Sequence, residues 1–203
     1  MPEAEAPRHL RPALEALLAL FKDAGVPGIV VGGLAVGVHA QPRTTQDVDA
    51  LILFDMAELD GFLETAAKHG LEYRRPDGPV LARQNRVLVL RHVPSGVPID
   101  IALGCMPFDE EAVNNAVRRD IAGVSTPIPT PDDLVIMKAV AHRPIDGGDI
   151  DMLLTVHPPA DLRRIRRWVK QYADLLHDPE IVTDLEKVLK RHKGARRSKP
   201  KGA

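Results

Sequence analysis

Residues 28–54 read GIVVGGLAVGVHAQPRTTQDVDALILF, a segment in which the pattern predicts two buried strands. Ile29–Val31 is a short apolar run that leads directly into Gly32 and Gly33. The second strand is predicted over Asp47–Phe54, which is apolar except for its two aspartates. Aspartate is a poor strand former, so two acidic groups in an apolar strand need a specific explanation.

The acidic residues of these strands form a candidate metal site. Asp47 and Asp49 are two residues apart, so on a strand both side chains project from one face. A third aspartate, Asp100, lies in another predicted strand, Val97–Leu103. Burying three carboxylates is costly unless cations compensate their charge, and oxygen ligands without nearby His or usable Cys favour Mg²⁺ or Mn²⁺ over zinc. The alternative is that each aspartate faces solvent on an edge strand or pairs with an arginine.

The diglycine is a candidate phosphate-binding turn. Gly32 and Gly33 stand where a strand meets a helix, so the backbone can approach a ligand closely and free N–H groups attract phosphate. Close packing of helix on strand would also favour glycine here. A phosphate-favouring turn followed, after thirteen residues, by metal-favouring carboxylates suits a nucleoside triphosphate with bound Mg²⁺. The chain lacks both GxxxxGK[ST] and GxGxxG, so a P-loop and a dinucleotide fold are unsupported.

The elements outside this segment complete an α/β half followed by a helical half. Val87–Leu90 and Val97–Leu103 are predicted to form a hairpin, because Pro94-Ser95-Gly96 between them favours a turn. A short extended piece is predicted near Val124. Helices are predicted over residues 8–24, 34–40, 56–69, 108–119, 131–142, 147–156, 160–176 and 179–192. The predicted domains are an α/β core over 1–126, a helical domain over 127–192 and a disordered basic tail over 193–203.

The composition excludes several classes of protein. The chain has 203 residues, of which 44% are hydrophobic, so it can bury a core and is too apolar to be wholly disordered. Its one cysteine, Cys105, excludes an intramolecular disulfide framework and a zinc ribbon. No apolar run approaches the roughly 18 residues of a membrane span, and the acidic N-terminus argues against a secretory signal. A cytoplasmic protein without a membrane partner is expected.

The formal net charge of −1 hides an asymmetry along the chain. Residues 1–160 carry 14 basic and 22 acidic side chains, whereas residues 161–203 carry 13 basic and 6 acidic ones. This split indicates a polyanionic partner for the basic end, although solubility alone can also produce it. Aromatic residues are only 3% of the chain, so backbone electrostatics rather than base stacking would dominate contact with a nucleic acid.

These motifs together resemble a known family. Gly32-Gly33, thirteen residues, Asp47-Val48-Asp49 and a later strand with Asp100 resemble the nucleotidyltransferase superfamily, which has the polymerase-beta-like fold. More narrowly, GGLAVGVHAQPRTTQDVDALI resembles the AbiEii-type group, which includes toxins of type IV toxin–antitoxin systems. The GG…RxTxDhDh pattern of that group is matched by Gly32, Gly33, Arg43, Thr45, Asp47 and Asp49. Its downstream lysine and R…D..D segment are matched by Lys138, Arg143, Asp146 and Asp149.

The chain also departs from that group in its last segment. Ile145 stands where the group usually has a lysine, and the Gly147-Gly148 pair is unusual within a helix. The resemblance, which runs from about residue 28 to 155, implies an α+β fold with a mixed sheet flanked by helices and a C-terminal helical region.

The resemblance implies an enzyme that transfers a nucleotidyl group from an NTP, such as ATP, to a hydroxyl and releases pyrophosphate. It implies two divalent ions, Mg²⁺ or Mn²⁺, held by Asp47, Asp49 and Asp100. Asp100 would also take the hydroxyl proton, and Lys138 would neutralise phosphate charge. The implied nucleotide-binding residues are Gly32, Gly33, Arg43, Thr45 and Asp149.

Other roles for these residues stay open. Lys138 could be a helix lysine whose stem packs on the core while its ammonium reaches water. Asp146 and Asp149 could be first-turn acids that favour the helix dipole. Arg43 could be a loop salt-bridge partner, and Thr45 an ordinary strand-entry residue.

Three hypotheses for the function remain. The first is a nucleotidyltransferase that acts on RNA, at the 3′ end of tRNA, with a toxin role and an antitoxin protein as partner. The second keeps the chemistry and changes the acceptor to a protein hydroxyl or a small molecule such as an aminoglycoside. The third is a non-catalytic nucleotide- or RNA-binding module on the same fold.

Overall fold

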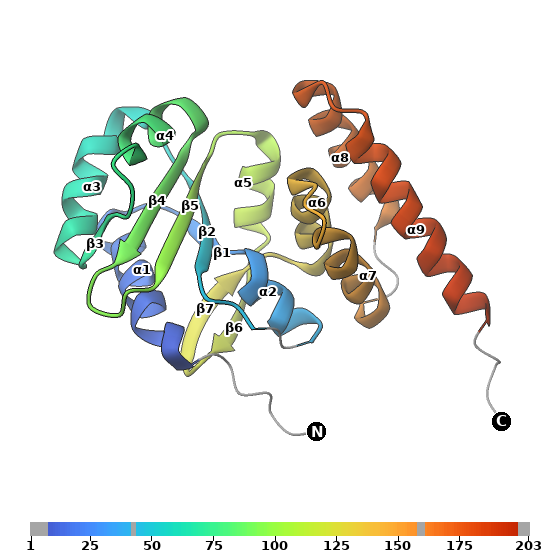
Figure 1. The fold of residues 1–203 in the computed structure, drawn as a ribbon, viewed down its shortest axis with the longest axis horizontal. Coiled ribbons are helices and arrows are strands. Elements are labelled where there is room, and N and C mark those ends of the chain that lie inside the picture. Colours follow the sequence, from blue (N-terminus) through green and yellow to red (C-terminus); the bar gives the residue numbers. More distant parts are fainter. Residues whose placement is uncertain (1–7, 42–43, 158–160, 199–203) are drawn as a thin grey trace. The chain divides into compact units, whose positions relative to one another are not determined.

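In the part of the chain described by the structure, a computed structural model covering residues 8–41, 44–157 and 161–198, five strands form one mixed sheet in the order β1-β2-β5-β4-β3 (Figure 1). They are β1 (Gly28–Val30), β2 (Val48–Leu53), β3 (Leu71–Tyr73), β4 (Val87–His92) and β5 (Pro98–Gly104). β2 and β5 run parallel, and the other neighbouring pairs run antiparallel. The predicted α+β fold with a mixed sheet is therefore confirmed, as is the β4–β5 hairpin.

The described part of the chain that forms this sheet also contains seven helical segments. They are the 3₁₀ turns η1 (Arg8–Leu10) and η2 (Met56–Glu58) and the α-helices α1 (Arg11–Asp23), α2 (Gly32–His39), α3 (Leu59–Lys68), α4 (Gly78–Asn85) and α5 (Pro107–Asn114). The helical spacing of leucines predicted α1, and Leu14, Leu17 and Leu20 are fully buried as that spacing requires. α2 begins at Gly32, whose φ of +64° makes the turn from the end of β1 into the helix.

The two faces of the sheet differ in burial. In β5 the side chains of Ile99 and Ile101 are fully buried, whereas Asp100 between them is half-buried. The buried face includes Ile52 of β2, which lies against Phe21 of α1, because a Cβ on Gly28 would touch both. This alternation leaves the opposite face of β2 and β5 available for polar groups.

A second, two-stranded sheet corrects one prediction. The helix predicted over 108–119 ends at Asn114, and β6 (Val117–Ile121) follows, paired antiparallel with β7 (Val124–Ile128). Ala122 and Gly123 between these strands both have positive φ, 55° and 83°, which is the geometry of a tight hairpin turn. Residues 117–119, which were predicted to end the helix, therefore belong to a strand, because this turn pairs them with β7. β3 and α4 were not predicted, because such short elements leave no clear periodicity in the sequence.

The C-terminal helices are close to those predicted. They are α6 (Pro131–Ala141), α7 (Asp146–Val156), α8 (Leu162–Leu176) and α9 (Glu180–Ser198), and α6 contacts each of the other three. α9 continues to Ser198, past residue 192, where the sequence predicted the helix to end. Residues 199–203 of the predicted tail lie outside the described part.

The chain divides into two compact units. The first ends at Thr130 and the second begins at Pro131 and also includes His39–Gln41. The predicted boundary between residues 126 and 127 falls inside β7, which is paired with β6 along its whole length. Among the described helices, none combines the length and the apolar character that crossing a bilayer requires.

Candidate active site

One row of residues crosses the half-exposed face of the five-stranded sheet. Asp49 of β2 is paired in register with Asp100 of β5, and Asp100 is paired in turn with Val89 of β4. Arg74 follows β3, and its backbone N–H donates to the Val89 carbonyl at 3.1 Å. Residues paired across strands project to the same face, about 4.8 Å apart. The carboxylates of Asp49 and Asp100 therefore stand side by side.

Arg74 supplies the cation for this pair of acids. Its Nη2 donates to Asp100 Oδ2 at 2.9 Å and lies at the same distance from Oδ1. The Asp100 Oδ1 atom is nevertheless buried and accepts no hydrogen bond from the described residues. Two like charges on neighbouring strands repel each other, so the guanidinium offsets part of that repulsion. Charge attraction to Arg74 is therefore the interaction that the structure gives this buried oxygen among the described residues.

Sequence reasoning missed Arg74. It lies in the segment Glu72-Tyr73-Arg74-Arg75-Pro76, where no strand was predicted, so nothing in the sequence placed it beside Asp100. The sequence did offer one indication, since the alternative to a metal site was that an aspartate of the cluster pairs with an arginine. Which arginine does so depends on the register of three strand pairs.

Gly32 lies directly against the Asp49 carboxylate. Its φ is +64°, and a Cβ at this position would stand only 1.9 Å from Asp49 Oδ2. The neighbouring Val31 N–H donates to the Asp49 carbonyl at 2.9 Å, which ties the strand end to β2. Gly33, the second residue of α2, continues the helix. The sequence predicted close backbone approach at the diglycine, and the group that approaches in this structure is a carboxylate of the predicted metal site.

Replacing Gly32 by alanine is expected to destabilise the first unit by about 2 kcal/mol or more. An L-residue in the left-handed region costs about 1–2 kcal/mol, and the clash with Asp49 adds to this. The free energy of unfolding from a denaturant titration measures the effect. Gly61→Ala is the control, since a Cβ there meets nothing within 4 Å and alanine favours the helix by up to about 1 kcal/mol. Equal effects of both substitutions would contradict the steric argument.

The remaining acid of the predicted metal site lies just outside the strand. Asp47 comes one residue before β2, and its Oδ1 accepts a hydrogen bond from Thr45 Oγ1 at 2.7 Å. Thr45 is buried, so it orients this carboxylate. Within the described ranges, no three His, Cys, Asp or Glu side chains are gathered in an arrangement that could hold a metal ion. The structure thus joins Asp49 with Asp100 and Thr45 with Asp47, while the predicted ligand Arg43 lies outside the described residues.

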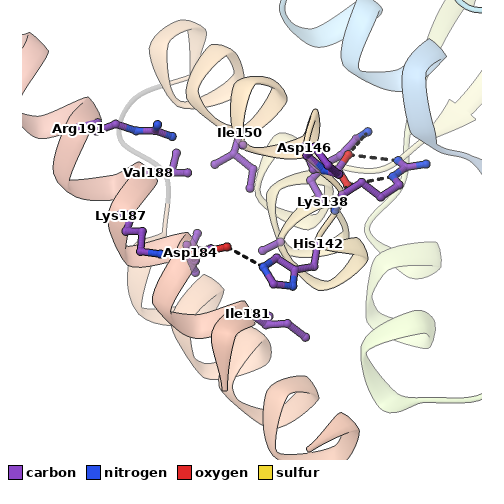
Figure 2. A pocket seen from close by; sticks show the side chains of 14 residues that line it. Lys138, His142, Asp146, Ile150, Ile181, Asp184, Lys187, Val188 and Arg191 are labelled. Atoms are coloured by element: carbon purple, nitrogen blue, oxygen red, sulfur yellow. Dashed lines mark hydrogen bonds and ion pairs between the residues drawn. The ribbon is translucent and has the colours of Figure 1, made fainter. Parts of the chain in front are cut away.

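The second predicted motif forms a buried ion-pair network in the helical unit. Lys138 of α6 is 3% exposed; its Nζ donates to Asp146 Oδ1 at 3.0 Å and lies 2.8 Å from Asp149 Oδ2. Figure 2 shows the Lys138–Asp146 contact at the start of α7. The backbone N–H and the Nε of Arg143 both donate to Asp146 Oδ2 at 3.0 Å. The motif residues are therefore brought together as a compact set of two cations and two carboxylates.

Charge compensation is nearly complete inside this network. Burial by itself raises the pKa of Asp146, but hydrogen bonds from Arg143 and Lys138 outweigh it and hold that pKa below its ordinary value. The ammonium of Lys138 does not reach water at the end of an exposed stem, and Asp146 and Asp149 do more than favour a helix dipole. Neither alternative from the sequence describes the observed arrangement.

Much of the positive charge in α8 and α9 is also paired with acids. Arg166 lies 2.6 Å from Glu186, Lys170 2.8 Å from Asp174 and Lys187 2.6 Å from Asp184. Arg164 pairs with the fully buried Asp133. Among described side chains of this region, the basic groups without an acidic partner are Arg163, Arg167, Lys190 and Arg191. Among the described side chains of α8 and α9, acidic partners thus leave fewer cations for a polyanion than the number of basic residues there indicates.

Comparison with known families gives one match that covers most of the chain. Residues 11–191 match a family described as "Nucleotidyl transferase of unknown function (DUF2204)". The comparison with curated proteins gave no match.

Three solved structures are similar in fold. An antigenic nucleotidyltransferase-like protein from Paracoccidioides brasiliensis shares 14% identity over 89% of this chain and 94% of its own, with a TM-score of 0.45. The antibiotic-resistance factor ANT(2'')-Ia in solution shares 15% identity over 92% and 95%, with a TM-score of 0.44. ANT(2")-Ia in complex with adenylyl-2"-tobramycin shares 14% over 90% and 98%, with a TM-score of 0.42. At such scores these likenesses carry no argument about chemistry.

Proposed function

This chain belongs to the family of nucleotidyl transferases that matches residues 11–191, and we propose that it transfers a nucleotidyl group from an NTP to an acceptor hydroxyl at the Asp49–Asp100 pair. The acceptor oxygen forms a bond to the α-phosphorus, the bond from that phosphorus to the β-phosphate oxygen breaks, and pyrophosphate leaves. The observation that carries the proposal is the register that sets Asp49 beside Asp100, with Gly32 against Asp49.

The donor set suits divalent cations. Mg²⁺ and Mn²⁺ prefer carboxylate oxygens, and Asp100 Oδ1 is a buried oxygen of this kind for which a metal ion would compete with the Arg74 guanidinium 2.9 Å away. Asp49 and Asp100 would hold the ions, and Asp47, which the structure does not gather with them, remains the predicted third ligand of a two-ion site. When bound, such ions act as Lewis acids on the phosphate oxygens and on the acceptor hydroxyl.

The other residues of the proposed site act on the substrates. Asp100 accepts the proton of the acceptor hydroxyl, and the N–H groups of Gly32 and Gly33 hold the phosphates at the start of α2. Thr45 fixes the Asp47 carboxylate through its hydroxyl. Lys138, Asp149 and Arg43 remain predicted nucleotide ligands.

Replacing Arg74 by glutamine is expected to tighten Mn²⁺ binding about fivefold. The guanidinium competes with a metal ion for the oxygens of Asp100, and its half-exposed ion pair is worth about 1 kcal/mol. Isothermal titration calorimetry without nucleotide measures the affinity. Arg91→Gln is the control, because Arg91 is exposed on β4 and makes no ion pair with Asp100. Unchanged or weaker binding in the Arg74 variant would contradict the competition.

The proposed acceptor is RNA, at the 3′ end of tRNA. The proposal is supported by the four basic side chains of α8 and α9 without acidic partners, since a nucleic-acid acceptor needs its phosphates neutralised. A toxin role with an antitoxin partner rests on the AbiEii-type resemblance of residues 32–52. A small-molecule acceptor is the alternative, because Arg166, Lys170 and Lys187, among the described basic residues, are paired with acids.

The direct test is incubation with each α-labelled NTP, Mg²⁺ and total RNA. Labelled tRNA with equimolar pyrophosphate is the expected product. Label on protein, or on an added aminoglycoside, would replace RNA by another acceptor while keeping the chemistry. Absence of pyrophosphate release with all acceptors would contradict nucleotidyl transfer itself.

A further inference from the structure

The helical unit contains a pocket that shares only Lys138 with the residues named for the proposed reaction at the sheet. It has a volume of about 360 Å³ and is formed by the C-terminal end of α6, the start of α7 and one side of α9 (Figure 2). Small-molecule sites in proteins begin at about this size. All its lining residues belong to the second unit, so its shape is set within that unit.

The apolar part of the pocket lies between α7 and α9. Ile150 of α7 lies toward Val188 of α9 (Figure 2), and Ile181 and Leu185 of α9 also line the pocket. These side chains are 2–5% exposed, so they form a closed apolar base beneath a polar rim. Such a base favours a ligand that has an apolar body.

The rim is basic. Its charged lining consists of the basic groups Lys138, His142, Arg143, Lys187 and Arg191 and the acids Asp146 and Asp184. Asp146 is already neutralised by Lys138 and Arg143, so it adds no net negative charge to the rim. The net charge of the rim therefore depends on its remaining charged residues, which are His142 and the α9 residues Asp184, Lys187 and Arg191.

Among these residues, the Asp184 carboxylate meets two cations. Asp184 accepts from His142 Nε2 at 2.8 Å and from Lys187 Nζ at 2.6 Å. The hydrogen bond that His142 donates to Asp184 raises the pKa of His142, with the more distant Asp178 adding to the effect, so the imidazole is cationic over a wider pH range. Arg191 has no acidic partner among described residues, and its guanidinium lies near Gly147 in the first turn of α7. The rim thus keeps unpaired N–H donors on Lys187 and Arg191.

We propose that this pocket binds an organic phosphate of nucleoside-monophosphate size, with the phosphate on Arg191 and Lys187 and the apolar body over Ile150 and Ile181. Phosphate is favoured because these two donors are charged and exposed at one edge, and charge-assisted hydrogen bonds to phosphate are the strong ones. A cationic ligand would face an excess of like charge at the same rim. The inference does not rest on the proposed transfer reaction.

The test is a titration of the protein with AMP in the presence of EDTA, followed by NMR of isoleucine ¹³C-methyl groups. EDTA removes divalent ions, so binding reports on the pocket and not on a metal-dependent site. The methyl signals of Ile150 and Ile181 are expected to shift, while those of Ile99 and Ile101 in the sheet stay in place. A dissociation constant on the order of 10⁻⁴ M is expected for a ligand of this size in an open pocket.

Variants at exposed positions test the recognition without disturbing the fold. Arg191→Gln and Lys187→Gln are each expected to weaken AMP binding about tenfold, the value of one charge-assisted hydrogen bond. Lys190→Gln is the matched control, because Lys190 is exposed on α9 and does not line the pocket. Asp49→Asn, at the proposed catalytic pair, is expected to leave AMP binding unchanged.

Related probes decide the ligand class. Adenosine and inorganic phosphate are each expected to bind at least tenfold more weakly than AMP, and spermidine is expected to cause no shift. Adenosine binding as tightly as AMP would overturn the phosphate assignment, and phosphate binding as tightly as AMP would overturn the role of the apolar body. No shift of Ile150 and Ile181 with AMP, or binding that is insensitive to Arg191→Gln, would overturn the pocket itself.

Discussion

Replacing Asp49 by asparagine is expected to lower kcat/KM for nucleotidyl transfer by at least about 10³-fold and to leave the fold intact. Loss of one carboxylate weakens binding of the proposed divalent ions, whose charge stabilisation is worth several kcal/mol in the transition state. The substitution keeps the size of the side chain against Gly32 and leaves the Arg74–Asp100 ion pair in place. Pyrophosphate release under saturating Mg²⁺ measures the rate.

Fold integrity and metal binding separate this explanation from simple unfolding. Removing one of two adjacent carboxylates relieves repulsion, so the free energy of unfolding is expected to change by less than about 1 kcal/mol. Mn²⁺ affinity is expected to fall together with the rate. Asp60→Asn, at a highly exposed acid of α3, is the matched control and should change neither. An Asp49→Asn protein with full activity would exclude Asp49 from the catalytic site.

Replacing Lys138 by methionine is expected to destabilise the helical unit by about 3–5 kcal/mol. Methionine fills a similar volume, but Asp149 loses a cation at 2.8 Å, and Asp146 keeps only Arg143. Breaking a buried pair by removing one partner leaves uncompensated charge, which accounts for that magnitude. The fluorescence of Trp168, the only tryptophan of the chain and a residue of α8, follows unfolding of this unit in denaturant.

Lys187→Met is the control for that experiment. Lys187 also pairs with an aspartate, but its side chain is 67% exposed, so its loss is expected to cost less than about 1 kcal/mol. A change of under 1 kcal/mol for Lys138→Met would show that its ammonium does not hold the two carboxylates.

The ion-pair network of Lys138, Arg143 and Asp146 also predicts that the helical unit loses stability in acid. Because the folded pKa of Asp146 lies below its ordinary value of 3.8, its contribution to stability is present above that value and is lost as pH falls through the lowered pKa.

The two sequence motifs differ in how much of their role the sequence revealed. The spacing of Asp47 and Asp49 before an apolar run predicted a strand with acids at its start, and β2 carries Asp49 on its less buried face. Lys138 and Asp149 were also predicted as site residues, but as phosphate- and nucleotide-binding groups, and Asp146 was matched only to the motif of the family. Their burial in mutual ion pairs could not be predicted, since burial depends on how α6 and α7 pack.

Local order in the sequence determined most of the helices, the β4–β5 hairpin and the position of the acids along their strands, because periodicity and turn chemistry act between near neighbours. Only the tertiary structure decided that Asp100 stands beside Asp49 and that Arg74 reaches it across Val89. Strand register determines these pairings, and a shift of one residue would turn Asp100 to the buried face. The register is set when the apolar faces of all the strands are buried together. It therefore cannot be predicted from any one short segment of the sequence.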